Sequence, residues 1–143
     1  MRKLTKLFTG KMIFLDTSFI ISYYNTRDQN HGKAKRVMEN ILNSEKKILI
    51  NDYIFDECAN VLLIKLKDFN NIIKICQDLK KLEIVNIDES LFDEAWDIFR
   101  KQRKTKLSFT DSTILSTMRC IGIKTLATFD NDFKKIPEIS ILN

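Results

Sequence analysis

Glycine, proline and histidine are scarce in this chain of 143 residues, which contains three glycines, one proline and one histidine. So little glycine and proline leaves little room for long flexible linkers, and the length is that of one domain. The single histidine, His31, falls in an expected loop and has no candidate partners beside it. A Ser–His–Asp triad is therefore not expected, and the chemistry must come from other side chains.

Cysteine is also rare, and long apolar runs are missing. Cys58, Cys76 and Cys120 are odd in number and fit no zinc-binding spacing, so we expect small buried residues in a reducing compartment. No apolar run approaches the roughly 20 residues of a membrane helix. The basic start is not followed by a signal sequence, because Asp16 interrupts the apolar run too early. We therefore expect a cytoplasmic protein that makes no contact with membranes.

The first eleven residues differ from the rest because four of them are basic: Arg2, Lys3, Lys6 and Lys11. We predict a basic N-terminal extension over residues 1–11 and a single domain over residues 12–143. Two interpretations of the extension stay open. It is either a disordered tail or a segment that precedes the native start, because Met12 opens the first expected strand.

Short apolar runs alternate with segments of helical periodicity. Strands are expected at 12–15, 46–51, 82–87, 124–128 and 139–142, and helices at 19–24, 31–43, 54–66, 69–81, 91–99 and 108–121. This alternation predicts an α/β protein, an α/β/α sandwich around a central parallel sheet of four to five strands.

Polar residues mark where these helices begin and end. Thr17 or Ser18, Asn51 or Asp52, and Asp88 or Ser90 are the candidate N-caps, and Gly122 is the candidate C-terminal stop. The aromatic side chains at 92, 96 and 99 follow the helical period, so we expect them to face inward. Phe109, Phe129 and Phe133 are also expected in the core rather than as platforms for bases.

Four carboxylates are expected at one edge of the sheet. Asp16 directly follows the first strand, and Asp130 directly follows the fourth. Glu57 lies early in the helix after the second strand, and Asp111 lies in the first turn of the helix before the fourth. Because the carboxyl ends of parallel strands and the N-termini of the following helices share an edge, all four can point into one crevice.

Carboxylates that lie so close together repel one another and raise one another's pKa unless a cation lies among them. Hard oxygen ligands suit Mg²⁺ or Mn²⁺, and one or two ions fit such a crevice. A bound ion of this kind lowers the pKa of a water molecule and stabilises charge in an in-line phosphoryl displacement. The pattern indicates a metal-dependent enzyme that acts on phosphate esters.

The charge distribution favours a phosphate polymer as the substrate. The net charge is +5, and if five candidate acids (the four above and Asp132) are set aside, 14 acidic residues remain against 24 basic ones. An acidic crevice in a basic surround suits a nuclease, because Lys and Arg bind backbone phosphates. The basic run before Asp111 supplies candidate residues that would bind backbone phosphates, Lys101, Arg103 and Lys104.

Each of these residues also has a structural explanation. Glu57 and Asp111 suit the positive end of a helix dipole, Asp130 and Asp132 are common turn residues, and a basic run suits a solvated helix end. Any one of the four acids could have a purely structural role. It is less expected that all four would meet at one edge of the sheet by chance.

The motifs together resemble a known family. Phe14-Leu15-Asp16-Thr17-Ser18, Asp56-Glu57, Phe109-Thr110-Asp111-Ser112 and Leu126-Ala127-Thr128-Phe129-Asp130-Asn131-Asp132-Phe133 occur in the order and at the separations of the PIN-domain ribonucleases. Within that family the chain is most similar to the VapC-like toxins of toxin–antitoxin pairs. The resemblance runs from Met12 to about Leu142, and the basic extension is not part of it.

The resemblance implies roles for individual residues. Asp16, Glu57, Asp111 and Asp130 would bind one or two Mg²⁺ or Mn²⁺ ions, with Asp132 either as an auxiliary ligand or as a group that contacts the ligands without binding the ion. Thr17 and Thr128 would donate hydrogen bonds that orient the carboxylates. The implied activity is endoribonuclease cleavage that leaves a 5′-phosphate and a 3′-hydroxyl. The implied partners are RNA, a second copy in a homodimer, and a small antitoxin.

Two alternatives to a toxin stay open: an RNA-processing or quality-control PIN nuclease without an antitoxin, and a non-catalytic PIN-like module that binds RNA or protein. The intact acidic quartet argues against the second. A haloacid-dehalogenase-like phosphatase is excluded, because it needs a second Asp where this chain has Ser18. A dinucleotide-binding enzyme is excluded because no glycine-rich turn follows the first strand.

Overall fold

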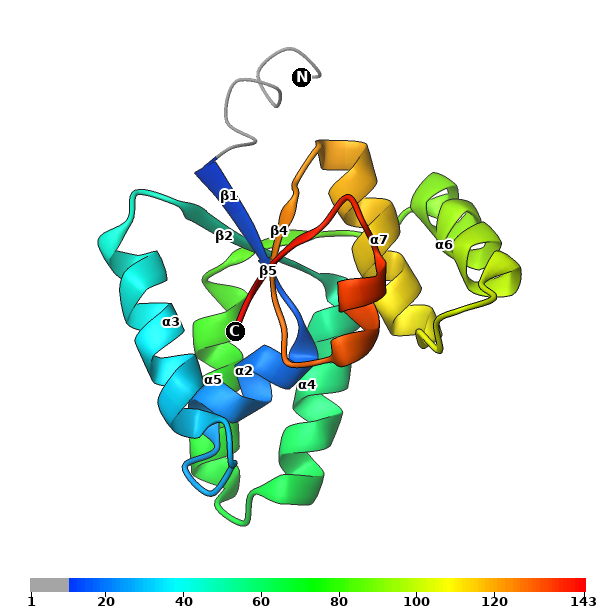
Figure 1. The fold of residues 1–143 in the computed structure, drawn as a ribbon. Coiled ribbons are helices and arrows are strands. Elements are labelled where there is room, and N and C mark those ends of the chain that lie inside the picture. The colour runs from blue at the N-terminus through cyan, green and yellow to red at the C-terminus, as the bar shows by residue number, and fades with distance from the viewer. Residues whose placement is uncertain (1–10) are drawn as a thin grey trace.

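The fold is built on a parallel sheet with its first strand at the centre. The structure is a computed structural model that describes residues 11–143, so the predicted basic extension lies, apart from Lys11, outside the described residues. The sheet has the order β3-β2-β1-β4-β5, and all neighbours are parallel (Figure 1). Its strands are β1 (Met12–Leu15), β2 (Lys47–Asn51), β3 (Glu83–Val85), β4 (Thr125–Ala127) and β5 (Ser140–Leu142).

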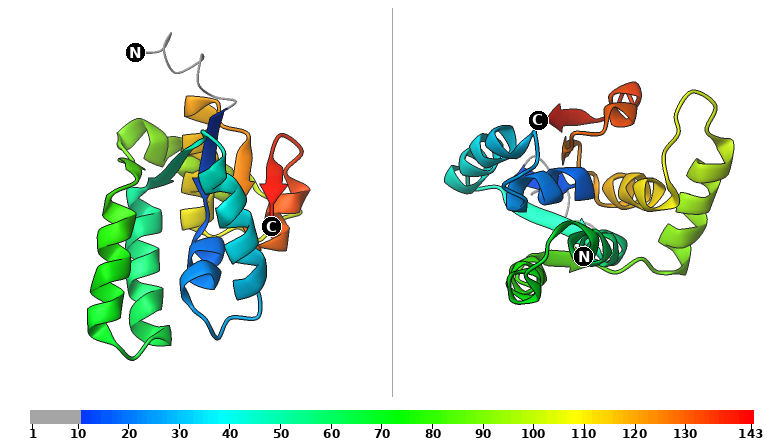
Figure 2. Two further views of the ribbon diagram at one scale, coloured as in Figure 1. Left: turned by 90° about the vertical axis from the view of Figure 1, so that its left-hand side faces the viewer. Right: turned by 90° about the horizontal axis from the view of Figure 1, so that it is seen from below.

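Six α-helices flank this sheet. They are α2 (Thr17–Tyr24), α3 (His31–Asn43), α4 (Asp52–Lys65), α5 (Phe69–Lys80), α6 (Glu89–Lys101) and α7 (Phe109–Ile121). A short 3₁₀ helix at Asn131–Lys135 follows β4. Figure 2 shows α2 and α3 to one side of the strands and α6 and α7 to the other. The predicted α/β/α sandwich around a parallel sheet is confirmed, with five strands.

The central position of β1 follows from its composition. All four of its residues are apolar and buried. Phe14 pairs with Leu49 of β2 on one side and with Leu126 of β4 on the other. Because both neighbours run parallel to β1, the residues that follow all three strands emerge at the same edge. The register pairs Leu15 with Ala127, which brings Asp16 beside Thr128.

The helix starts follow the predicted caps at most positions. Asn51 caps α4, since its Oδ1 accepts a hydrogen bond from the Ile54 N–H at 2.9 Å. Asp88 caps α6 in the same way through the Leu91 N–H at 2.9 Å. Gly122 ends α7 with a left-handed φ of 85°, a conformation that favours glycine. These three predictions are confirmed.

The prediction for the start of α2 is wrong. The N-cap is Asp16, not Thr17 or Ser18, and its backbone carbonyl accepts the Phe19 and Ile20 N–H groups. The Asp16 side chain makes no capping hydrogen bond. The first turn of α2 is therefore closed by backbone alone, which leaves the carboxylate available for other contacts.

The expectation that the aromatic residues of α6 face inward is also wrong. Leu91 and Ala95 are the buried residues of this helix. Phe92, Trp96 and Phe99 are exposed, Trp96 by 50%, because α6 packs against α7 at the outside of the molecule. Phe109 joins them, with ring centroids 5.0 Å from Phe92 and 6.0 Å from Phe99. Exposed aromatic clusters of this kind are enriched at protein interfaces.

Other core predictions are confirmed only in part. Phe133 is fully buried and Phe129 stacks on the buried Phe19, but Phe109 lies in the exposed aromatic cluster. Cys58 is buried as expected, whereas Cys76 is half-buried and Cys120 is exposed in the last turn of α7. Cys120 belongs to a segment with helical periodicity, but it falls on the solvent-facing side of α7.

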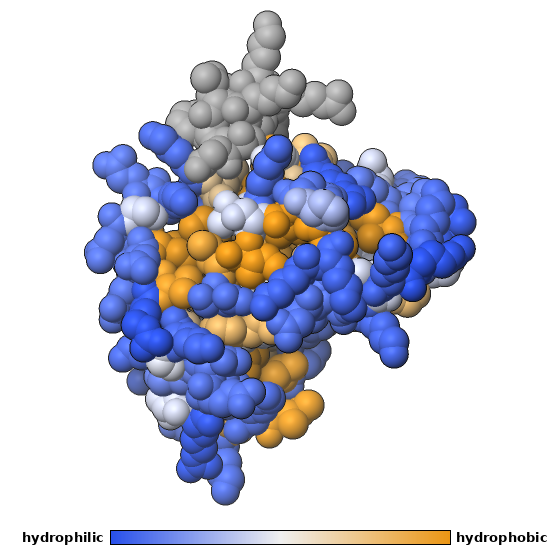
Figure 3. Space-filling model, viewed as in Figure 1, coloured by the Kyte–Doolittle hydropathy of each residue, from blue (hydrophilic) through white to orange (hydrophobic). Residues whose placement is uncertain are grey.

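The surface is mainly hydrophilic, with an apolar band across the face seen in Figure 1 (Figure 3). Ile141 and Leu142 of the edge strand β5 are half-buried against the core. No helix within residues 11–143 is both long and apolar enough to cross a membrane.

We predict that Asn51→Ala destabilises the fold by about 3 kcal/mol, because it removes a cap and a buried amide. The Asn51 Nδ2 donates to the hydroxyls of Thr113 and Thr117 at 3.1 and 3.3 Å, which joins α4 to α7. Urea unfolding followed by circular dichroism measures the change. Asn60→Ala, at an exposed position of α4, is the control and should stay within about 0.5 kcal/mol of wild type. Equal losses for both variants would contradict the prediction.

Candidate active site

A cleft of about 410 Å³ opens at the carboxyl ends of the central strands. Five acidic residues from separate parts of the chain line it: Asp16, Asp28, Glu57, Asp111 and Asp130. The structure thus brings together all four acids that the sequence placed at this edge. It adds Asp28, from the loop between α2 and α3.

Asp16 is the most deeply held of these groups, with only 3% of its surface exposed. Its Oδ2 accepts hydrogen bonds from the Ser18 hydroxyl at 2.6 Å and from the Thr128 hydroxyl at 2.7 Å. Oδ1 receives no hydrogen bond from residues 11–143 and is not among their fully buried, unpartnered polar atoms. This oxygen therefore faces the cleft and is free to bind a ligand.

The same two hydroxyls position the loop after β4. The Ser18 hydroxyl oxygen accepts the Phe129 N–H, and the Thr128 hydroxyl oxygen accepts the Asp130 N–H, both at 3.0 Å. Asp130 then starts the 3₁₀ helix by accepting the Asp132 N–H at 2.9 Å. The geometry of Asp16 and of Asp130 is consequently fixed by one small network.

Thr17 does not have the contact that the resemblance implied. Its hydroxyl is buried and has no hydrogen-bond partner among the residues that the structure describes. Its neighbour Ser18 binds Asp16 instead, because the first turn of α2 directs Ser18 back toward β4. The expected role of Thr128 agrees with its hydrogen bond to Asp16.

Asp111 both takes part in a helix cap and lines the cleft. Its Oδ2 accepts the Ser108 N–H at 2.9 Å while the Ser108 hydroxyl accepts the Asp111 N–H at 3.0 Å, which forms a capping box at the start of α7. One carboxylate oxygen is used in this way, and Asp111 still lines the cleft. The structural and the functional interpretations of this residue are therefore compatible.

Burial, with repulsion between carboxylates adding to it, raises the pKa of Asp16 and of Asp111. Burial and then the nearby charge of Asp16 raise the pKa of Asp111 to about 7, against the hydrogen bonds from Ser108. Burial also raises the pKa of Asp16, helped by the charges of Glu57 and Asp130 and opposed by Ser18 and Thr128. A cation in the cleft offsets this repulsion.

The donor set fits a hard divalent cation that keeps much of its water. Carboxylate oxygens are the ligands that Mg²⁺ and Mn²⁺ prefer. Within residues 11–143, however, no three acidic, histidine or cysteine side chains are close enough to form a compact metal cluster. Such a cleft suits an ion held by one or two carboxylates, with the remaining positions taken by water and substrate oxygens.

Asp132, the predicted auxiliary ligand, does not line the cleft. Its Oδ1 lies 2.9 Å from the Lys135 ammonium, and this hydrogen bond holds the pKa of Asp132 below its ordinary value. Lys135 also donates to the Lys104 carbonyl at 3.3 Å. Lys135 thus joins the 3₁₀ helix to the loop between α6 and α7, and Asp132 pairs with its ammonium.

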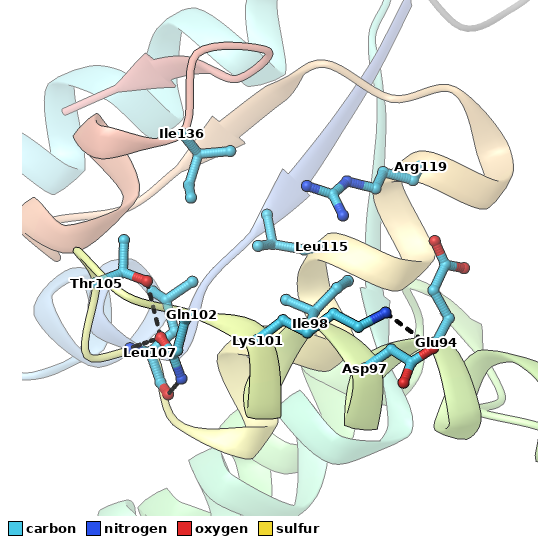
Figure 4. A pocket seen from close by; sticks show the side chains of 10 residues that line it. All are labelled: Glu94, Asp97, Ile98, Lys101, Gln102, Thr105, Leu107, Leu115, Arg119 and Ile136. Atoms are coloured by element: carbon cyan, nitrogen blue, oxygen red, sulfur yellow. Dashed lines mark hydrogen bonds and ion pairs between the residues drawn. The ribbon is translucent and has the colours of Figure 1, made fainter.

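None of the three predicted RNA-binding residues lines the cleft. Arg103 and Lys104 are exposed in the loop between α6 and α7, and this loop reaches the cleft at Ser108. Lys101, at the end of α6, borders a second cavity of about 390 Å³ (Figure 4).

This second cavity lies between α6 and α7. Its apolar lining includes Ile98, Leu115 and Ile136, and the Lys101 ammonium is 3.8 Å from Asp97 at its edge (Figure 4). Arg119 also borders it and pairs with Glu138 at 2.6 Å. This cavity is therefore bordered by charges of both signs, with each of these two bases beside an acid.

Sequence reasoning missed several residues of the cleft: Ser18, Asp28, Lys65 and Ser108. Ser18 was considered only as a candidate cap and Ser108 only as the start of a helix, and for Ser18 a hydroxyl two residues after Asp16 was the available signal. Asp28 gave no signal because it falls in a polar loop. Lys65 lies eight residues after Glu57, a helical spacing that places both on one face of α4.

Comparison with known proteins gives the family. Residues 13–139 match the PIN domain. The chain is 26% identical over 123 residues to the 23S rRNA-specific endonuclease VapC20 of Mycobacterium tuberculosis, covering 85% of this chain and 92% of that protein.

Solved structures agree. The crystal structure of M. tuberculosis VapC20, described as a Sarcin-Ricin loop cleaving toxin, matches with a TM-score of 0.78 and 24% identity, over 87% of this chain and 95% of that one. VapBC2 from Rickettsia felis bound to a promoter DNA fragment matches with a TM-score of 0.69 and 19% identity, over 91% and 96%. The resemblance to VapC-like PIN proteins is confirmed, and with a match over residues 13–139 this chain belongs to the PIN domain family.

Proposed function

We propose that this protein is a metal-dependent endoribonuclease and the toxin of a toxin–antitoxin pair. The observation that carries the proposal is the cleft where Asp16, Glu57, Asp111 and Asp130 meet. Membership of the PIN domain family and the similarity to VapC20 support the same activity. Because VapC20 is named for cleaving 23S rRNA, ribosomal RNA of the large subunit is the first substrate to test.

The cofactor is a divalent cation, for which we propose Mg²⁺ or Mn²⁺, with one or two ions bound. Asp16, Glu57, Asp111 and Asp130 would supply its ligands, with one or two of them bound directly to an ion and water completing its coordination, and Asp132 would act only from outside the cleft. When bound, the ion lowers the pKa of a water molecule and stabilises charge on the reacting phosphate. Ser18 and Thr128 hold Asp16 in one orientation, so that its free oxygen is presented without reorganisation.

Lys101, Arg103 and Lys104 are proposed to bind RNA phosphates beside the cleft. The chain also has a net charge of +5, which favours an anionic partner. As further partners we propose a small antitoxin and a second copy of this chain, and as its location the cytoplasm, where ribosomal RNA is found.

Asp16→Asn is expected to reduce RNA cleavage by roughly 100-fold or more, because the variant loses an ionised ligand at the centre of the site. Its fold should persist, since Asn still accepts a hydrogen bond from Ser18 or Thr128. The measurement is cleavage of purified 23S rRNA with Mg²⁺ or Mn²⁺, with the new ends mapped. Asp56→Asn, at an exposed neighbour of Glu57, is the control and should keep wild-type activity. Wild-type cleavage by Asp16→Asn would refute the site.

Added Mg²⁺ should stabilise the protein more at about pH 8 than at about pH 5. The pKa of Asp111 in the folded protein is raised to about 7. In the unfolded chain an aspartate has its ordinary, lower pKa and is therefore ionised at every pH well above that value. In chelator, stability therefore falls as the pH rises toward 7, because the unfolded carboxyl group is already ionised and folding must either take up a proton or bury the charge among other acids. The ion binds only the ionised groups. Thermal unfolding with chelator or Mg²⁺ at both pH values measures this, and a shift that is equal at both would contradict it.

Neutralising Lys101, Arg103 and Lys104 together, each to Gln, should weaken RNA binding and lower its salt dependence. Three lost phosphate contacts reduce the slope of log K against log salt by up to about 2 for single-stranded RNA. Binding of a fluorescent RNA oligonucleotide across a salt series measures the slope. A charge-matched control replaces Lys74, Lys80 and Lys81 of the α5 region with Gln. Identical slopes in the two triple variants would assign the basic run to a solvated helix end.

A further inference from the structure

Among the residues in the range 11–143 that line the acidic cleft, Lys65 is the only basic one. It lies in the last turn of α4 and is exposed. A polyanion that enters this cleft meets the charges of Asp16, Asp28, Glu57, Asp111 and Asp130. A cation at the border of such a cleft therefore has an electrostatic role that lysines elsewhere on the surface do not have.

The position of Lys65 is fixed by the helix that carries it. Glu57, Val61 and Lys65 are four residues apart in turn and all line the cleft, so they form one stripe along α4. At 1.5 Å per residue, the backbone at Lys65 lies about 12 Å along the helix axis from that at Glu57. The adjoining stripe of Ile54, Cys58 and Leu62 is fully buried and holds this orientation.

The ammonium of Lys65 is also free to bind an anion. It forms no ion pair with any residue in the range 11–143, whereas Lys101 and Lys135 are paired with Asp97 and Asp132. Val61 lies between Lys65 and Glu57, so the stripe passes from an acid through an apolar contact to a base. A strand of RNA laid along it would place its reacting phosphate at the acids and a later phosphate at Lys65.

We propose that Lys65 binds an RNA phosphate beside the one that is cleaved, and so positions the strand in the cleft. The inference rests on the proposed nuclease function and adds a substrate-positioning residue to it. A lysine in a last helical turn also suits the helix dipole. That structural role would change stability but not the salt dependence of RNA binding, and the two roles can therefore be separated.

The test compares Lys65→Gln, Lys65→Arg and Lys67→Gln. Lys67 is exposed two residues further along and does not line the cleft, so it controls for net charge. Binding of a fluorescent single-stranded RNA is measured across a salt series in an Asp16→Asn background, which prevents cleavage. KM and kcat for 23S rRNA are measured in the otherwise wild-type protein, and thermal unfolding is measured for every variant.

For Lys65→Gln we expect the slope of log K against log salt to fall by about 0.7, the value for one lost contact with a single strand. KM should rise while kcat stays near wild type, because a positioning contact made before and during the reaction contributes to binding. Lys65→Arg should restore both values, and Lys67→Gln should change neither.

Two results would overturn the inference: a slope and KM in Lys65→Gln equal to those of Lys67→Gln, or a loss in Lys65→Arg as large as in Lys65→Gln. Either result leaves the nuclease function standing as long as the wild type cleaves RNA. Failure of the wild type to cleave any RNA with Mg²⁺ or Mn²⁺ would instead reject the proposed function itself.

Discussion

The site depends on the pairing of β1 with β4, because this pairing brings Asp16 beside Thr128. Leu15 lies opposite Ala127, and the Asp16 N–H continues the ladder by donating to the Ala127 carbonyl at 3.0 Å. Asp16 and Thr128 are the residues that directly follow these two strands, and the Thr128 hydroxyl donates a hydrogen bond to the Asp16 carboxylate at 2.7 Å. A shift of one residue in this register would turn Asp16 and Thr128 to opposite faces of the sheet and separate them.

Burial of these acids makes the free energy of folding less favourable when no cation is bound. Asp16 and Asp111 both have raised pKa values, with burial as the largest cause and neighbouring carboxylates adding to it. Hydrogen bonds from the hydroxyls of Ser18 and Thr128 to Asp16, and from the backbone N–H of Ser108 to Asp111, reduce this penalty without removing it. A well-packed core of β1, β2, β4 and the flanking helices supplies the stability that offsets it. Clusters of carboxylates that repel one another are typical of functional sites, because the same cluster attracts a cation that binds there.

Much of the fold could be predicted from periodicity alone. The apolar run at β1 and the spacing in α3 and α5 led directly to the observed elements, because these segments bury one clear face or both. The four acids were located because strand ends and helix starts share an edge in a parallel sheet. What periodicity does not give is how deeply a face is covered, and so Phe92, Trp96 and Phe99 were assigned to a core that α6 does not reach. The position of Asp28 depends on loop conformation, for which the sequence carries no periodic signal, and the pairing of Asp132 with Lys135 depends on a short 3₁₀ helix that the sequence analysis did not predict.

The cleft and its proposed substrate carry charge of the same sign, and this conflict constrains how they bind. Acids that line the cleft repel RNA phosphates as well as one another. A divalent ion held by the acids removes both repulsions, so RNA binds the ion-loaded protein more tightly. By thermodynamic linkage, the RNA must then increase the affinity for the ion by the same factor. An open cleft without a compact cluster of ligands fits this coupling, since a phosphate oxygen can complete a coordination that the carboxylates leave unfinished.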